Sequence, residues 1–300
     1  MKEKLYRVLR STSLGFECID EEKNTIKAPN RKKITYLGEK IVIGDFVSLD
    51  EEGIIASVAK RENYCPRPRL SNCDMAYVLS SCKEPDFDSY LLDKFLSFLN
   101  YYEIPASILL SKADLVKSVR EKKKLEKVAE YYRSLHYPVY FIDAKDSSHF
   151  DYPSFRESLR GKSVAFVGQT GVGKSSLINA IAPDFKRKVD ALYVNSGRGR
   201  HTTKEVILLP FEDSFLFDTP GFSELELRDI KTLDFAYSFP GYGEYLGKCA
   251  FKDCRHLPSS KGCSVLEAVK EGKLSEESYQ NYLRIYEDVK ENDAWKKKLP

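Results

Sequence analysis

The 300-residue sequence lacks a long apolar run and lacks a large excess of either charge. No stretch approaches the ~18 apolar residues of a membrane-spanning helix. The first residues, MKEKLYRVLR, have no apolar core of the kind that a signal peptide carries. The 48 basic and 45 acidic residues nearly cancel, which excludes a protein that is polycationic throughout. We therefore expect a cytoplasmic protein without membrane contact, in which nucleic acid binds only to local patches.

Cysteine is also scarce, and its spacing excludes a disulfide framework. The total of seven is odd; four cysteines are scattered, whereas three lie close to a histidine. In a chain without an export signal, this pattern indicates free thiols plus a metal site. The cluster is Cys249, Cys254, His256 and Cys263. Three sulfurs and one nitrogen make a complete tetrahedral set for Zn²⁺ and leave no open position for a substrate, so we predict one structural zinc site.

The chain divides into three segments by pattern. Residues 1–64 carry short runs of branched and aromatic residues between turn clusters, which is typical of a small β-barrel. The pattern is equally compatible with an oligonucleotide-binding (OB) fold and with another small barrel. The run from Pro66 to Pro68 predicts a stiff linker, because proline fixes φ and disfavours helix before it. Residues 226–300 predict helices around the cysteine cluster.

Residues 65–225 alternate apolar runs with helical patterns. Continuous apolar runs are typical of a sheet that is covered on both faces, so this segment predicts an α/β domain. The expected strands are 75–80, 106–110, 139–142, 163–167, 206–209 and 214–217, and the expected helices are 89–102, 118–135 and 174–181.

A phosphate-binding loop lies in the middle of this domain. The pattern G-x-x-x-x-G-K-[ST] is formed by Gly168, Gln169, Thr170, Gly171, Val172, Gly173, Lys174 and Ser175, and Ser176 follows it. An expected strand precedes the loop and an expected helix follows it. Backbone N–H groups would surround the phosphates, Lys174 would reach the β and γ phosphates, and the Ser175 hydroxyl would ligate Mg²⁺. The motif alone does not distinguish ATP from GTP.

A second motif, earlier in the chain, selects guanine. Ser111, Lys112 and Asp114 follow directly after an expected strand, at the end where open α/β sheets bind ligands. The Asp114 carboxylate can accept from N1–H and the exocyclic amine of guanine, and adenine offers neither donor in that arrangement. The motif resembles the N/T-K-x-D of the GTPase superfamily, with Ser111 in the first position, from which we expect weaker anchoring. Ala144, after the strand 139–142, would direct its N–H at the guanine O6.

The two switch motifs follow the phosphate loop. Asp218 and Gly221 match D-x-x-G, in which the aspartate holds Mg²⁺ through water and the glycine N–H contacts the γ-phosphate. Thr203, or else its neighbour Thr202, would close over Mg²⁺. Phe222 occupies the position where many GTPases have a glutamine that orients water, which predicts slow intrinsic hydrolysis. His201 is the nearest candidate to orient the water, and a role in binding phosphate or capping a loop is equally open.

The order of these motifs is reversed relative to ordinary GTPases, because both base-binding motifs precede the phosphate loop. Such an order is compatible with the same fold when the old termini are joined and the chain is cut elsewhere. The combination of a barrel, this permuted order and the C-terminal Cys/His cluster resembles the ribosome-small-subunit-dependent GTPase family (RsgA/YjeQ/YloQ). The residues from Val42 to Asp45, the pair Arg67 and Pro68, and the run from Gly199 to Thr203 support the resemblance.

The resemblance implies late maturation of the small (30S) ribosomal subunit, with GTP hydrolysis stimulated by that subunit, and contact with 16S rRNA by a monomer. The basic segment 186–204 then becomes a candidate rRNA contact. Two other functions stay open. The chain could be an RNA-binding module that uses GTP only as a conformational ligand, or a phosphate-loop enzyme that uses ATP, such as a small-molecule kinase.

Overall fold

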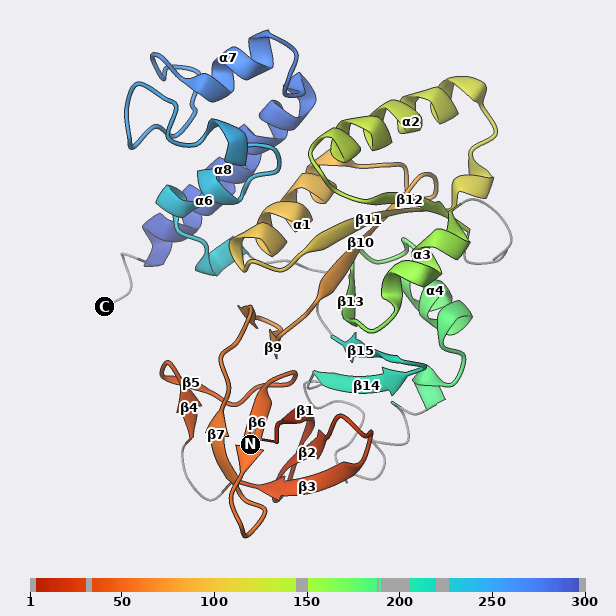
Figure 1. Cartoon of the computed structure of the whole chain (residues 1–300). Helices are drawn as coiled ribbons and strands as arrows, with labels where there is room; N and C mark the ends of the chain where they lie inside the picture. Colours follow the sequence, from red (N-terminus) through yellow and green to blue (C-terminus); the bar gives the residue numbers. More distant parts are fainter. Residues whose placement is uncertain are drawn as a thin grey trace. The chain divides into compact units, whose positions relative to one another are not determined.

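The computed structural model describes residues 4–30, 34–143, 151–187, 189, 206–219 and 227–296 (Figure 1). The chain forms two compact units. The first comprises Met1–Ala76, Pro153–Phe166 and Ser175–Phe222, and the second comprises Tyr77–Tyr152, Val167–Lys174 and Ser223–Pro300. Each unit draws residues from separate parts of the chain. The three domains expected from the sequence, with boundaries after residues 64 and 225, remain a prediction.

The first unit begins with a five-stranded antiparallel sheet in the order β3-β2-β1-β6-β7. Its strands are β1 (Tyr6–Thr12), β2 (Gly15–Ile19), β3 (Thr25–Pro29), β6 (Phe46–Leu49) and β7 (Ile55–Val58). β4 (Thr35–Tyr36) and β5 (Glu39–Lys40) pair with each other as a two-stranded ribbon, and the Lys40 carbonyl accepts from Arg61. One face is packed by fully buried side chains such as Val8, Cys18 and Val47. The all-β character expected for this segment is confirmed.

The linker expected at residues 66–68 is wrong. This segment turns between β8 (Tyr64–Pro66) and β9 (Arg69–Ser71), which pair as a hairpin. Cys65 and Leu70 are fully buried. The two prolines are compatible with the hairpin. Pro66 lies at the end of β8 and Pro68 lies in the turn, where no hydrogen bond from the backbone nitrogen to the partner strand is needed.

The turn from Val42 to Asp45 packs against this hairpin. Gly44 has φ +94°, and a Cβ there would lie 2.1 Å from the Ser71 carbonyl oxygen, so only glycine allows the approach. The fully buried Asp45 carboxylate forms a salt bridge to Arg61 with an N–O distance of 2.7 Å, and it accepts a hydrogen bond from the Ser71 hydroxyl. A buried carboxylate needs such partners, since an uncompensated charge is costly to bury.

The first unit also holds three strands from the later part of the chain. They are β13 (Ser163–Val167), β14 (Ile207–Phe211) and β15 (Ser214–Asp218), in the order β13-β15-β14. β13 and β15 are parallel, with Ala165 opposite Phe217, so both strands end at the same edge. Helices α3 (Tyr152–Leu159) and α4 (Lys174–Ile181) lie on either side of β13 in the sequence.

The second unit contains three buried strands, β10 (Met75–Ser81), β11 (Ala106–Ser111) and β12 (Val139–Ile142), in the order β12-β11-β10. Asp88 caps helix α1 (Ser89–Tyr101), and its carboxylate accepts from two backbone N–H groups; Ser118 caps α2 (Val119–Ser134), and its hydroxyl accepts from one, that of Glu121. A short 3₁₀ turn, η1 (Ala113–Leu115), follows β11. The strands and helices expected for this segment are confirmed to within two residues.

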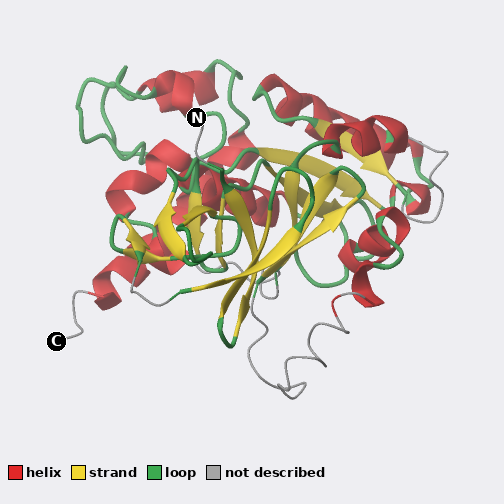
Figure 2. Cartoon of the chain, turned by 60° about the horizontal axis from the view of Figure 1, so that its bottom comes forward, coloured by secondary structure: helices red, strands yellow, loops and turns green. Residues whose placement is uncertain are grey.

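The C-terminal part of the second unit is helical with long loops between helices (Figure 2). Its elements are η2 (Leu227–Asp229), α6 (Thr232–Ser238), η3 (Gly243–Tyr245), α7 (Ser264–Lys270) and α8 (Glu276–Lys296). Aromatic side chains form its core: Phe235, Phe239, Tyr242 and Tyr282 are nearly inaccessible, and the Phe235 and Tyr282 rings stack with centroids 5.5 Å apart. Among the described residues, no helix is long and apolar enough to cross a membrane.

Candidate nucleotide site and Cys/His cluster

The phosphate loop leads from β13 into α4 and depends on glycine conformations. Gly168 has φ +143°, and a Cβ there would lie 2.4 Å from the Leu79 carbonyl oxygen. Gly173, directly before the helix, has φ +98°. These conformations strongly favour glycine, and they leave the backbone N–H groups of the loop free to converge at the N-terminus of α4. The geometry is that of an anion-binding loop.

The Lys174 side chain turns back over this loop. Its ammonium group donates to the carbonyl oxygens of Gly168 and Gln169, the latter at 3.0 Å. Burial lowers the pKa of Lys174 to about 8, because no carboxylate offsets the loss of water. A phosphate group close to this ammonium would favour the charged form and raise the pKa again.

Ser111 connects the base-binding motif to the phosphate loop. Its hydroxyl lies 2.6 Å from the Val172 carbonyl oxygen and 3.4 Å from the Ser80 carbonyl oxygen, and the side chain is 4% exposed. The loop contact therefore exists in spite of the short side chain.

Lys112 makes the second link between the two motifs. It adopts a left-handed backbone conformation with φ 56°, and its ammonium group donates to the Gly171 carbonyl at 2.8 Å and to the Glu84 carbonyl. Asp114 follows in the turn η1, and its carbonyl accepts from Lys117. The two motifs, which lie about 60 residues apart in sequence, thus form one site in the second unit.

The strand ends place the remaining motifs. β11 and β12 are parallel, with Ser111 opposite Ile142, so Asp143 follows β12 at the edge where Lys112 follows β11. In the first unit, the parallel strands β13 and β15 end at the phosphate loop and at Asp218. Ser175 and Ser176 begin α4 and are exposed. The expected positions Ala144, His201, Thr202, Thr203, Gly221 and Phe222 lie outside the described residues.

The four expected zinc ligands converge. The ligand atoms of Cys249, Cys254, His256 and Cys263 all lie within 4.8 Å of one another. Nδ1 of His256 is 3.3 Å from the Cys263 sulfur and 3.6 Å from the Cys249 sulfur. Three thiols and one imidazole in this compact arrangement are the donor set that Zn²⁺ binds in structural sites.

The surroundings of His256 favour metal ligation. The side chain is 3% exposed, and burial lowers its pKa to about 4, so the ring is neutral and can offer a nitrogen lone pair. Tyr279 donates to the His256 carbonyl at 3.0 Å, and Tyr282 donates to the Arg255 carbonyl at 2.6 Å. Helix α8 therefore fixes the backbone of the cluster loop from outside the ligand set.

Sequence reasoning missed the loop from Cys82 to Asp88. Its Glu84 carbonyl accepts from Lys112, and its Lys83 forms an ion pair with Glu121 of α2 at 3.0 Å. No motif marks this loop, since its role depends on backbone carbonyls rather than on particular side chains.

Comparison with known proteins gives consistent matches. The family model described as RsgA GTPase matches residues 58–228. The chain is 33% identical over 294 residues to the small ribosomal subunit biogenesis GTPase RsgA of Bacillus subtilis (strain 168), with 95% of this chain and 97% of the relative covered. It is 36% identical over 283 residues to the protein of that name from Bacillus anthracis, with 92% and 94% covered.

Two solved structures are similar over nearly the whole chain. One is YjeQ from Thermotoga maritima, with a TM-score of 0.79, 30% identity, and 96% of this chain and 98% of that chain covered. The other is YloQ, described as a circularly permuted GTPase, with a TM-score of 0.79, 29% identity and 96% of both chains covered. The permuted order of motifs and the fold therefore agree with these structures.

Proposed function

Because the chain belongs to the RsgA GTPase family and is a GTP hydrolase, we propose that it hydrolyses GTP on the small (30S) ribosomal subunit and assists its late maturation. The relatives carry the name small ribosomal subunit biogenesis GTPase, and the alignments with this chain cover nearly the whole length of each relative. We further propose that it acts in the cytoplasm as a monomer in contact with 16S rRNA.

The observation that carries the proposal is the pair of links between the base motif and the phosphate loop. Ser111 and Lys112 bond to the carbonyls of Val172 and Gly171, so one bound nucleotide can reach both motifs. Asp114 then selects guanine, because its carboxylate would be left without a donor opposite adenine. The Ala144 N–H would add a contact to the guanine O6.

The remaining roles follow from the family chemistry. Lys174 and the loop N–H groups, with Gly221, hold the β and γ phosphates. Ser175, Thr203 and Asp218 would hold Mg²⁺, and the bound ion would neutralise charge on the transferred phosphoryl group. Water attacks the γ-phosphorus, the bond to the bridging oxygen breaks, and GDP and inorganic phosphate leave. Phe222 cannot orient this water, so His201 or the subunit supplies the orientation.

The Cys/His cluster holds one structural Zn²⁺ in this proposal. The support is the donor set within 4.8 Å and the neutral, buried imidazole. All four positions are filled by protein, so the ion shapes the loop and takes no part in hydrolysis.

The test is GTP turnover by the purified chain alone, with small subunits and with large subunits. We expect slow turnover alone and stimulation of roughly 10³-fold or more by small subunits only, the range that an activating contact supplies. Excess ATP should leave the rate unchanged. The substitution Asp114→Asn replaces one carboxylate oxygen, an acceptor, by an amide NH2 group, a donor. This variant should lose the preference for GTP over ATP.

Two outcomes would support the other functions. Nucleotide-dependent binding to small subunits without turnover would mean that GTP acts only as a conformational ligand. Competition by ATP at concentrations similar to GTP would indicate an ATP-using enzyme.

A further inference from the structure

Helix α2 carries an exposed stripe of positive charge. The stripe consists of Arg120, Lys123, Lys124 and Lys127, all of which are exposed. At about 100° per residue, these four side chains fall within about a quarter of the helix circumference. They lie opposite the buried positions Leu125, Ala129 and Tyr132. The stripe therefore faces away from the core along about 10 Å of helix.

Two of the three acids of the helix pair with residues outside this stripe, and the third, Glu130, forms no ion pair with the stripe in the described part of the chain. Glu121 forms its ion pair with Lys83 at 3.0 Å, and Glu126 forms one with Arg133 at 3.3 Å. None of the four stripe residues forms an ion pair with another residue in the described part of the chain. The whole protein has a net charge of only +3, so four adjacent unneutralised cations form a local feature.

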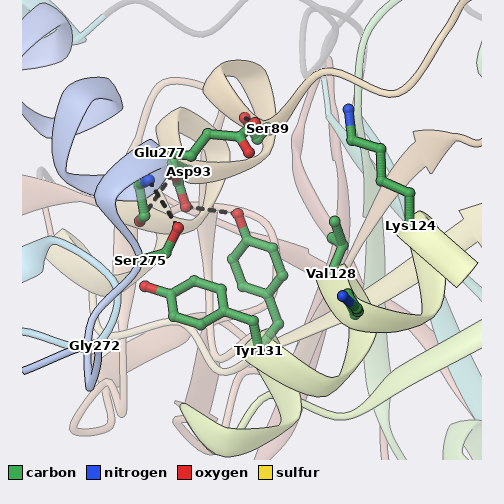
Figure 3. A pocket seen from close by; sticks show the side chains of 11 residues that line it. Ser89, Asp93, Lys124, Val128, Tyr131, Gly272, Ser275 and Glu277 are labelled. Atoms are coloured by element: carbon green, nitrogen blue, oxygen red, sulfur yellow. Dashed lines mark hydrogen bonds between the residues drawn. The ribbon is translucent and has the colours of Figure 1, made fainter. Parts of the chain in front are cut away.

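The stripe borders a cavity of about 340 Å³ that offers hydrogen-bonding groups (Figure 3). Lys124 and Lys127 line it, together with Tyr131 from the same helix and Ser275. The Tyr131 hydroxyl is buried and interacts with Ser275 and Ser278. The ammonium groups of Lys124 and Lys127 suit a phosphate oxygen, which carries negative charge and accepts hydrogen bonds.

The two acids at this cavity already have partners. Asp93 accepts from the Tyr132 hydroxyl at 2.8 Å and from the Asn281 amide at 2.8 Å, and Glu277 accepts from Ser89 at 2.6 Å. Both carboxylates are therefore held by hydrogen bonds within the protein, and the other charged side chains that line the cavity are those of Lys124 and Lys127. An acidic backbone suits this surface better than a basic peptide.

We propose that this stripe on α2, defined by Arg120, Lys123, Lys124 and Lys127, binds the phosphate backbone of RNA. The proposal rests on the proposed function, since the small subunit supplies the RNA, and it assigns a contact surface outside the nucleotide site. α2 begins five residues after Asp114, so RNA on this helix would bind close in sequence to the base-binding turn. About three phosphates of one strand match the length of the stripe, at ~3.4 Å per phosphate along a duplex axis.

The test is a variant with all four residues changed to Gln, which keeps helix propensity close to that of Lys and Arg. Binding to purified small subunits is measured with a non-hydrolysable GTP analogue at several salt concentrations. Each phosphate contact contributes about 0.7–0.9 to the magnitude of the slope of log affinity against log salt, so the loss of about three contacts should reduce that magnitude by about 2–3. Affinity at 0.1 M salt should fall by roughly tenfold or more.

Two matched variants separate phosphate binding from a structural effect. Changing Lys123, Lys124 and Lys127 to Arg keeps the charge and should retain both affinity and slope. Lys122→Gln removes one exposed lysine from another side of the same helix and should change neither. Melting temperature and basal GTP turnover should match the wild type in all variants.

Failure of this inference differs from failure of the proposed function. A wild-type chain that neither binds nor responds to small subunits would contradict the proposed function. The stripe would be overturned as an RNA surface if the wild-type chain binds and the variant with all four residues changed to Gln binds with the same affinity and the same salt slope. Weaker binding to subunits with unchanged binding to protein-free 16S rRNA would assign the stripe to an acidic protein instead and would also overturn it.

Discussion

A single hydroxyl joins the guanine motif to the phosphate loop. Ser111 is buried and lies 2.6 Å from the Val172 carbonyl, a distance typical of a good O–H···O hydrogen bond. The bond holds the loop in place before the nucleotide binds. The entropy lost on ordering the loop therefore does not reduce the binding free energy.

Ser111→Ala should therefore weaken both GTP and GDP binding. Loss of one buried hydrogen bond costs about 1 kcal/mol, which corresponds to roughly fivefold in affinity. Equilibrium titration with a fluorescent guanine nucleotide measures the change. Ser111→Thr keeps the hydroxyl and should bind with the affinity of the wild type. Equal affinity of the Ala and Thr variants would show that the bond contributes nothing to preorganisation.

At the residue scale, the sequence predicted the two loops that meet at this site, and the roles of individual residues stay predictions. The spacing of the motif predicts the glycine and lysine positions of the phosphate loop. Every such loop needs backbone conformations with positive φ at fixed positions, and these favour glycine. The cysteine cluster followed from composition alone, and its atoms converge. The link from Lys112 to Glu84 could not be predicted, since any residue offers a carbonyl and the sequence gives no sign of which one is in reach.

At the scale of elements, α1 and α8 meet through a polar seam. Asp93 on α1 is fully buried and accepts from Tyr132 of α2 and from Ser278 and Asn281 of α8. Ser89 and Tyr90 at the start of α1 donate to Glu277 and Asp288 of α8. The seam joins the helix before the guanine motif to the last helix of the chain.

Burial raises the pKa of Asp93 from 3.8 to about 7, against the opposing effect of its hydrogen-bond donors. Since the folded-state pKa is raised, the stabilisation is complete below pH 4 and is lost as the pH rises through 7. Between pH 5 and pH 8 the wild type should lose on the order of 2 kcal/mol through this group. Asp93→Asn cannot ionise, so its stability should be less sensitive to pH over that range.

Thermal unfolding of both proteins at pH 5 and pH 8 measures this effect. The Asn variant gives up one acceptor and should be less stable than the wild type at pH 5, and the difference should shrink at pH 8. Hydrogen exchange in α1 and α8 reports whether the seam itself opens. A difference in stability that is the same at both pH values would show that Asp93 does not titrate in this range.

The bounds of helices and strands were predicted well where the apolar pattern was strong. They were predicted poorly where the structure depends on which strands pair with each other. The strands β12 and β13 and helix α4 have the expected bounds. The hairpin of β8 and β9 was taken for a linker, because a proline-rich run looks the same in a turn and in an extended segment. Its burial depends on contacts with Ile43 and Gly44, which local sequence does not encode.

At the scale of the whole molecule, permutation lets the chain close one nucleotide site from motifs in reversed order. The contacts between residues 111–112 and 171–172 span about 60 residues, and the C-terminal segment then returns to α1 through α8. The C-terminal helices have an aromatic core of their own. Tyr282 of this core lies against His256, with ring centroids 6.4 Å apart, so we expect the metal to hold the cluster loop and the aromatic side chains to hold the helices.

Removal of zinc should therefore act locally. Without the ion, the four ligand atoms within 4.8 Å lose the bonds that hold them together, whereas the packing of Phe235 and Tyr282 is unchanged. We expect faster hydrogen exchange in residues 249–263, little change in the buried part of α8, and unchanged GTP affinity. Stimulation by small subunits should fall if this loop faces the subunit, and zinc added back should restore both exchange and stimulation. Exchange in 249–263 that is the same before and after metal removal would mean that the thiols and imidazole do not depend on an ion for their arrangement.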